Sequence, residues 1–214
     1  SLQVLRGGVR FIHLCGGVLL SRKAVLTAGH CRRIRRILVH SEFKSETFEN
    51  DVAVFELSSA VQSSLHIQPI CLPPAPLQPQ LENGSDCYVS GWGRTAEKGN
   101  GPCLSCLCST SWDMETFIIK PHNVLCLIHF LLPSAGDSGG PLVCYHPDRY
   151  YLIGIASFGV GCGRPKYPGI YVRLSQYRTW IKTKLKLTSR TPKPTSTTLT
   201  LLLTVAHTVL TQTF

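Results

Sequence analysis

The sequence predicts an all-β, antiparallel domain that is completed by one C-terminal helix. Three observations support this fold class. Short apolar runs recur along the chain and alternate with glycine, proline and other turn-forming residues, which is typical of antiparallel strands. Glycines inside several of these runs indicate bulges or close backbone approaches, as in β-barrels. One stretch near the C-terminus instead has apolar residues at helical spacing.

The predicted strands are short and follow one another from the start of the chain. Each is rich in apolar residues and is bounded by turn signals. No internal repeat is apparent among them. The strands are predicted at residues 11–21, 23–28, 36–40, 51–57, 87–93, 141–145, 151–159 and 169–175.

The one predicted helix follows the last of these strands. Ser175 is a residue type that commonly caps a helix N-terminus, and we expect it to do so here. The apolar residues that follow recur every three or four positions, so one side of the helix is expected to pack onto the β-structure. These residues are Tyr177, Trp180, Ile181 and Leu185.

Residues 188–214 differ in composition from the chain before them, and we predict a polar linker followed by a short hydrophobic tail. The apolar part, Leu199 to Leu210, is only twelve residues long and is interrupted by threonines. A membrane-spanning helix needs about twenty apolar residues. The pattern fits a lipid-anchor attachment signal or an unstructured secreted tail, and both readings stay open.

The composition of the 214 residues favours a folded protein of an oxidising compartment. Apolar residues make up 43% and charged residues 16%, which excludes a disordered chain or a coiled coil. Ten cysteines indicate structural disulfides and a secreted or cell-surface setting. Asn83 in "NGS" is a predicted glycosylation site. The "PCLSCLC" stretch has no second cluster at zinc spacing, so no metal and no cofactor are predicted.

The formal net charge of +10 is partly concentrated in the stretch "CRRIRR". Its arginines are either an ordinary solvated face or a contact for a polyanion or a membrane surface. Nucleic acid is not expected as a partner, because no aromatic-basic motif accompanies the charge. The residues concerned are Arg32, Arg33, Arg35 and Arg36.

The stretch "SAGDSGGPLVC" places Ser138 between glycines, next to an acid. A serine hydroxyl is a poor nucleophile until a base removes its proton and donors stabilise the resulting oxyanion. Glycines tolerate positive φ, so they let successive backbone N–H groups point at one spot. We therefore interpret Ser138 as a nucleophile, with an oxyanion hole formed by the N–H groups of Gly136 and Ser138.

Two further segments supply the groups that such a serine needs. "VLTAGHC" places His30 at the end of a strand, next to a cysteine that can anchor the loop. "ENDVAVFEL" places Asp51 at the start of another strand, where the following apolar run would bury it. A lone histidine or aspartate of this kind is usually structural. Three such segments in the order His, Asp, Ser favour a catalytic triad.

With these motifs, the chain resembles the chymotrypsin-like, or trypsin-like, serine proteases. Matching segments run from "HLCGGVLLS" through "GDSGGPLVC" to "GIYVRLSQYRTWI" and cover most of residues 1–187, which we predict to be the protease domain. The resemblance implies two antiparallel six-stranded β-barrels and a serine endopeptidase that acts on proteins or peptides through an acyl-enzyme. It also implies that Ser138 attacks the carbonyl, His30 is the general base and Asp51 orients His30.

The resemblance implies further roles along the chain. Asp137 would pair with the amine that activation cleavage frees, and "SFG" would pair with the substrate backbone. Disulfides would join Cys15 to Cys31 and Cys87 to Cys144. Residues implied to bind substrate are Leu132, Ser157, Gly159 and Gly169.

The chain also departs from the family pattern. Only 21 residues separate His30 from Asp51, so the first barrel is expected to be shortened. Ser134 replaces an expected cysteine, and Leu132 stands where trypsin-type members have an acid, which favours apolar over tryptic specificity. No "IVGG"-like start is present, so a zymogen-like state and incomplete segments are expected. The alternative is an inactive homologue that acts as a binding or decoy module. Either form would be secreted or anchored outside the cell.

Overall fold

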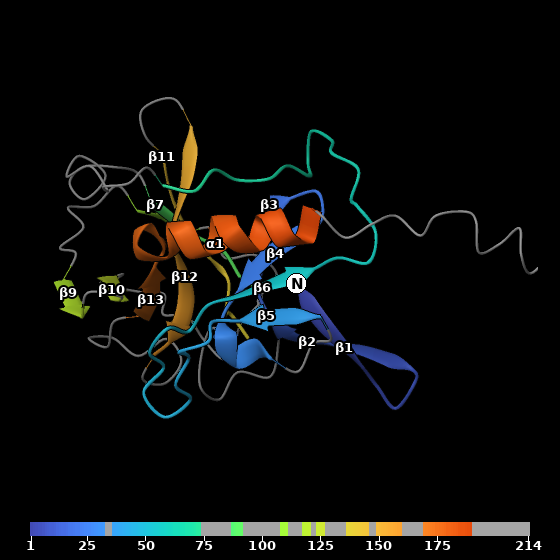
Figure 1. Cartoon of the computed structure of the whole chain (residues 1–214), viewed down its shortest axis with the longest axis horizontal. Coiled ribbons are helices and arrows are strands. Elements are labelled where there is room, and N and C mark those ends of the chain that lie inside the picture. The colour runs from blue at the N-terminus through green and yellow to red at the C-terminus, as the bar shows by residue number, and fades with distance from the viewer. Residues whose placement is uncertain are drawn as a thin grey trace, which may run out of the picture.

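The computed structural model describes residues 1–32, 36–73, 87–91, 108–110, 117–120, 123–126, 136–145, 149–159 and 169–189. Its first half contains a two-stranded ribbon and a four-stranded antiparallel sheet, in the strand order β3-β4-β6-β5. Figure 1 shows the ribbon extending away from the rest of the molecule. The strands are β1 (Leu2–Arg6), β2 (Arg10–Cys15), β3 (Val18–Ser21), β4 (Ala24–Thr27), β5 (Ile37–Val39) and β6 (Ala53–Glu56).

The second half forms a seven-stranded antiparallel sheet in the order β8-β7-β11-β12-β13-β10-β9. The long strand β12 is at its centre, between β11 and β13, and is almost entirely buried. The strands are β7 (Cys87–Val89), β8 (Cys108–Thr110), β9 (Phe117–Lys120), β10 (Asn123–Cys126), β11 (Pro141–Tyr145), β12 (Tyr150–Phe158) and β13 (Gly169–Arg173).

The helix α1 (Leu174–Ser189) lies across the molecule and packs against β6 of the first half and β12 of the second (Figure 1). Its side chains Leu174, Tyr177 and Ile181 are buried, as expected for residues three or four positions apart. In the described part of the chain, no helix is both long and apolar enough to cross a membrane.

The largest hydrophobic cluster is shared between the two halves and the helix. Val18, Leu26 and Val54 come from the first sheet, while Leu152 and Ile155 come from the second. Each sheet buries one face against the other, so this core is complete only when both halves are folded together. A second cluster, around the Cys87–Cys144 disulfide, belongs to the seven-stranded sheet alone.

The predicted all-β fold with a C-terminal helix is confirmed. Strands β1, β8, β9 and β10 were not predicted, and two of the predicted elements need correction. The strand predicted at 11–21 is interrupted at Gly16 and Gly17, which separate β2 from β3. The helix begins at Leu174, and the hydroxyl of Ser175 is buried without a hydrogen-bond partner among the described residues, so Ser175 does not cap the helix. Residues 190–214, with the predicted hydrophobic tail, lie outside the described residues.

Candidate active site

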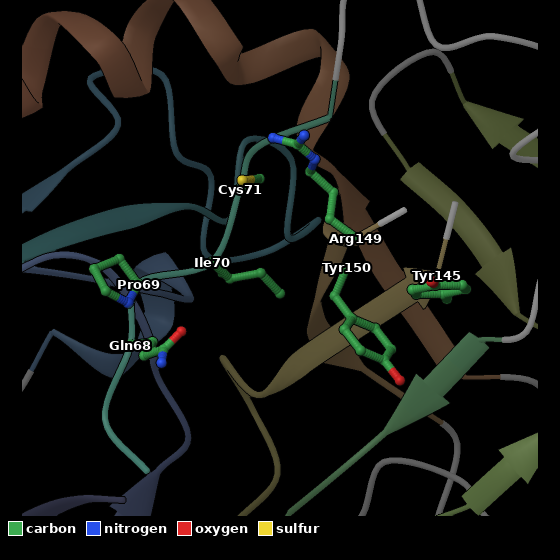
Figure 2. A pocket seen from close by; sticks show the side chains of 7 residues that line it. All are labelled: Gln68, Pro69, Ile70, Cys71, Tyr145, Arg149 and Tyr150. Atoms are coloured by element: carbon green, nitrogen blue, oxygen red, sulfur yellow. The ribbon is translucent and has the colours of Figure 1, made fainter. Parts of the chain in front are cut away.

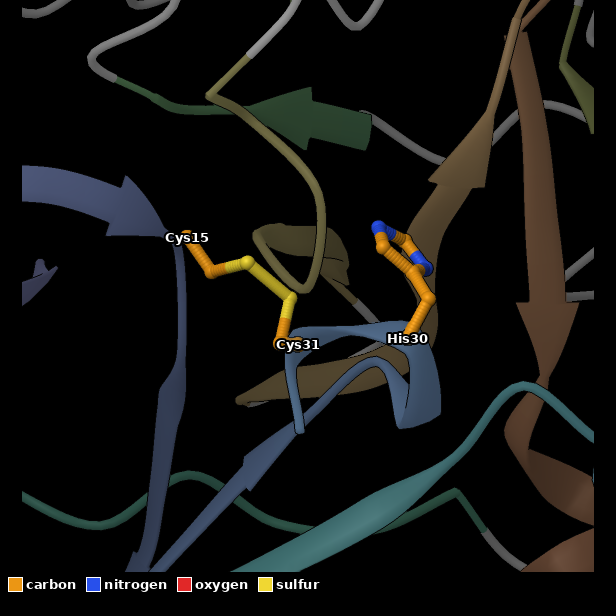
Figure 3. A group of neighbouring side chains, drawn as sticks. All are labelled: Cys15, His30 and Cys31. Atoms are coloured by element: carbon orange, nitrogen blue, oxygen red, sulfur yellow. A yellow bond between two sulfur atoms is a disulfide. The ribbon is translucent and has the colours of Figure 1, made fainter. Parts of the chain in front are cut away.

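His30 lies in a short 3-10 helix, η1 (Gly29–Cys31), directly after β4. The disulfide between Cys15 and Cys31 fixes this turn to the end of β2, as Figure 3 shows. The two sulfur atoms lie close to the His30 ring, but they are bonded to each other and offer no thiolate. These three residues therefore form a covalently anchored turn rather than a metal site.

His30 and Asp51 are joined by two hydrogen bonds. The ring nitrogen Nδ1 of His30 lies 2.8 Å from Oδ2 of Asp51, and the backbone N–H of His30 donates to Oδ1 at 2.8 Å. The Asp51 side chain is fully buried, whereas the His30 side chain keeps 26% of its surface exposed. Because the buried carboxylate accepts the Nδ1 proton, the other ring nitrogen, Nε2, carries the free lone pair in the neutral imidazole.

Ser157, at the end of β12, makes a further contact with the same carboxylate. Its hydroxyl donates to Oδ2 of Asp51 at 2.5 Å, and its residue is buried. The resemblance implied only that residues 157–159 pair with the substrate backbone. A hydrogen bond from Ser157 to Asp51 was not predicted. An acid buried without a cation needs several donors, and Asp51 has three of them.

An aromatic wall stands beside His30. The ring of Phe48 meets the His30 ring edge-on at a centroid distance of 5.4 Å. Phe158 in turn lies 5.1 Å from Phe48. These rings place apolar surface against one side of the imidazole.

Ser138 lies in a turn that is held by backbone hydrogen bonds. The N–H of Gly16 donates to the carbonyl of Ser138 at 2.8 Å, and the N–H of Gly139 donates to Ala156 in β12 at 2.7 Å. The Ser138 carbonyl oxygen is also 3.9 Å from the sulfur of Cys31. The structure thus brings the backbone of Ser138 next to the residue that follows His30.

Two glycines allow this turn to form. Gly139 has a φ of 78°, and a methyl group on it would overlap the hydroxyl oxygen of Thr27. Gly16 approaches Gly140 so closely that a methyl group on Gly16 would lie 2.7 Å from the Gly140 Cα. Larger residues would therefore force the two halves apart at this contact.

The loop before Ser138 has a contact that sequence reasoning missed. Nε2 of His13 in β2 donates to the carbonyl of Gly136 at 2.6 Å, and Gly136 has a φ of 113°. Only the resemblance of "FIHLCGG" to the family could have drawn attention to His13, because 123 residues separate the partners. Asp137 lies against Gly91, where a methyl group would overlap its carboxylate. The predicted activation role of Asp137 stays a prediction.

The remaining predicted site residues that the structure describes lie in several different parts of the fold. Gly159 follows β12, and Gly169 begins β13 opposite Cys126. Arg32 and Arg36 are exposed, so the predicted contact with an acidic surface stays a prediction. Among the cysteines with described side chains, Cys71 has a free, exposed thiol. Predicted residues outside the described part of the chain are Leu132, Asn83, Arg33 and Arg35.

A separate cavity of about 510 Å³ is lined by residues 68–71 together with Tyr145, Arg149 and Tyr150 (Figure 2). It contains neither His30, Asp51 nor Ser138, so it is distinct from the candidate active site. The segment that forms one side of it is joined to β12, because the N–H of Leu152 donates to the Cys71 carbonyl at 2.9 Å.

The fold has the architecture of a trypsin-like serine protease. Hydrogen bonds join the histidine to the buried aspartate, and the backbone of the glycine-flanked serine lies near the disulfide-linked residue that follows His30. The family model described as Trypsin matches residues 1–34 and 32–181. The chain therefore belongs to the trypsin family of serine proteases.

Curated relatives agree with this assignment. The chain is 33% identical to serine protease filzig of Drosophila melanogaster over 78% of its own length, and 34% identical to transmembrane protease serine 7 of Mus musculus, also over 78%. It is 33% identical to transmembrane protease serine 11G of Mus musculus over 84%. The matched region spans 12%, 25% and 51% of these three proteins, respectively.

Proposed function

We propose that this chain is a serine endopeptidase that hydrolyses peptide bonds in protein substrates outside the cell. Family membership and the two disulfides support the reaction class and the oxidising compartment. The names of two relatives, both transmembrane proteases, agree with a protein that is secreted or anchored to the outer cell surface.

One observation carries the proposal: a fully buried Asp51 accepts the Nδ1 proton of a partly exposed His30. This hydrogen bond fixes the ring orientation and leaves Nε2 with the free lone pair that a general base needs. The carboxylate also stabilises the imidazolium that forms when the base takes up a proton.

In the proposed reaction, His30 Nε2 removes the hydroxyl proton of Ser138 as the serine oxygen bonds to the substrate carbonyl carbon. The N–H groups of Gly136 and Ser138 stabilise the oxyanion. His30 then returns its proton to the leaving amine as the C–N bond breaks, which leaves an ester on Ser138. Water, deprotonated by His30, attacks that ester and releases the acid, and Ser138 regains its proton.

The proposed side-chain preference rests on Leu132, which stands where trypsin-type members have an acid in the specificity pocket. Without a carboxylate at this position, an arginine or lysine side chain would find no opposite charge in the pocket. We propose that apolar side chains bind there instead. The walls of this pocket would be completed by the 157–159 strand and Gly169.

A fluorophosphonate probe tests the proposed nucleophile directly, because it reacts only with an activated serine. We expect the wild-type protein to be labelled and both Ser138→Ala and His30→Ala to lose labelling. Ser45→Ala, which removes an exposed serine in the 41–50 loop, is the matched control and should label like the wild type. A folded wild-type protein that fails to react would overturn the proposal and favour a non-catalytic binding module.

A further inference from the structure

Asp51 lies at the centre of a very tight turn. The N–H of Val52 donates to the carbonyl of Asn50 at 2.8 Å, which closes a three-residue γ-turn around Asp51. Asn50 has a φ of 55°, in the left-handed region that non-glycine residues rarely adopt. A turn of this kind persists only where its surroundings hold it. The direction of the Asp51 carboxylate therefore depends on what fixes Asn50.

The side chain of Asn50 is held at both of its polar ends. Its Nδ2 donates to the backbone carbonyl of Glu42 at 3.0 Å. Its Oδ1 accepts the hydroxyl proton of Tyr177, in α1, at 2.9 Å. Asn50 and Tyr177 are 127 residues apart, so the C-terminal helix reaches back to the residue directly before Asp51.

Tyr177 is well suited to act as a fixed donor. The residue is 3% exposed, and burial raises the pKa of its phenol, with smaller contributions in the same direction from the charges on Asp51, Glu42 and Glu49. A phenol with a raised pKa stays protonated, and so can donate, throughout the neutral range.

The same helix also holds the other side of the turn. The His40 ring packs against Tyr177 at 5.5 Å and against Trp180 at 5.1 Å. The backbone N–H of His40 donates to the carbonyl of Val52 at 3.0 Å. Thus α1 fixes Asn50 through a hydrogen bond and Val52 through packing on His40, with Asp51 between them.

We propose that Tyr177 and Asn50 are positioning residues for Asp51, through which the C-terminal helix sets the geometry of the His30–Asp51 pair. Neither residue touches the reacting atoms. The inference deepens the proposed function, but its first test does not depend on catalysis.

That test is the NMR resonance of the His30 Nδ1 proton, recorded on the full-length protein with ¹⁵N-labelled histidine. Tyr177→Phe keeps the ring and removes only the hydroxyl that holds Asn50. We expect the resonance to shift towards that of a weaker hydrogen bond and to broaden. Tyr171→Phe, which removes a buried tyrosine hydroxyl from β13, is the matched control and should leave the resonance in place.

Asn50→Gly provides a second, independent variant. Glycine adopts a φ of 55° without strain, so this change removes the side chain and keeps the turn. It should alter the His30 resonance as Tyr177→Phe does. The double variant should show no larger effect than Asn50→Gly alone, because Asn50→Gly already removes the hydrogen bond that Tyr177→Phe breaks. An unchanged resonance in folded Tyr177→Phe and Asn50→Gly proteins would overturn the inference.

Activity gives the catalytic consequence. In wild-type protein that reacts with the fluorophosphonate, each variant should lower kcat about tenfold, with KM nearly unchanged, because only the geometry of the base is lost. A variant that changes KM alone would contradict the positioning role. A wild-type protein that shows the His30 resonance but does not react would end the proposed function and leave the positioning inference standing.

Discussion

The two sides of the candidate active site are held by different kinds of interaction. On one side, Asp51 is fixed by donors that include the side chains of His30 and Ser157. On the other side, Ser138 is fixed by backbone hydrogen bonds, from Gly16 to its carbonyl and from its neighbour Gly139 to Ala156. The His30–Asp51 pair therefore depends on which side chains are present, whereas the position of Ser138 depends on the path of the main chain.

This difference determines which substitutions are harmful on each side. A change of one polar atom is enough to disturb Asp51, because a buried carboxylate that loses a donor has no water to replace it. The turn at Ser138 should be sensitive to added volume, since its neighbours are glycines at close backbone contacts. The following predictions test this comparison, from the largest expected effect to the smallest.

Asp51→Asn should have the largest effect. The amide occupies the same volume but cannot fix the same tautomer of His30, and such a change in a Ser-His-Asp triad lowers kcat about ten-thousand-fold. Steady-state kinetics on a peptide substrate measures the loss, and circular dichroism checks that the variant is folded. Activity within tenfold of the wild type would show that Asp51 does not govern the base.

Gly139→Ala should disrupt the serine side through the backbone. A left-handed φ costs a non-glycine residue about 1–3 kcal/mol, and the methyl group would in addition overlap Thr27. Urea unfolding measures the free energy of unfolding, and the rate of fluorophosphonate labelling reports on Ser138. Gly8→Ala is the matched control, because Gly8 also has a positive φ, of 73°, but has nothing within 4 Å. Equal losses in the two variants would argue against the close contact at Gly139.

Ser157→Ala should have the smallest of the three effects. It removes one donor to Asp51 and leaves both hydrogen bonds from His30 in place. A hydrogen bond to a charged group contributes about 1.5–3 kcal/mol, so we expect kcat/KM to fall by about ten- to a hundredfold. A loss as large as that of Asp51→Asn would mean that Ser157, rather than His30, dominates the environment of the carboxylate.

Much of the fold could be predicted because its signals are local. Apolar runs bounded by turn residues marked most of the described strands, and helical spacing marked α1. The break at Gly16 and Gly17 was missed, because an apolar run does not show where the chain leaves one sheet for the next. The start of α1 was misplaced, because the helix begins at Leu174 and already includes Ser175, the residue type that suggested a cap.

The residues of the candidate site that stand in sequence motifs could be predicted. His30, Asp51 and Ser138 each stand in a recognisable segment, and the structure joins the first two by hydrogen bonds. The contacts of His13 with Gly136 and of Tyr177 with Asn50 were not predictable, because they join residues more than a hundred positions apart. Such pairs form only when the chain folds back on itself and leave no local pattern.

The shared hydrophobic cluster has a consequence for when the site can exist during synthesis of the protein. Leu174, Tyr177 and Ile181 belong to this cluster and lie in the last described element of the chain. A nascent polypeptide that has emerged only as far as β12 already carries His30, Asp51 and Ser138, but not the helix that packs against β6 and β12. We therefore expect the candidate active site to mature late in translation, after this helix has left the ribosome and docked.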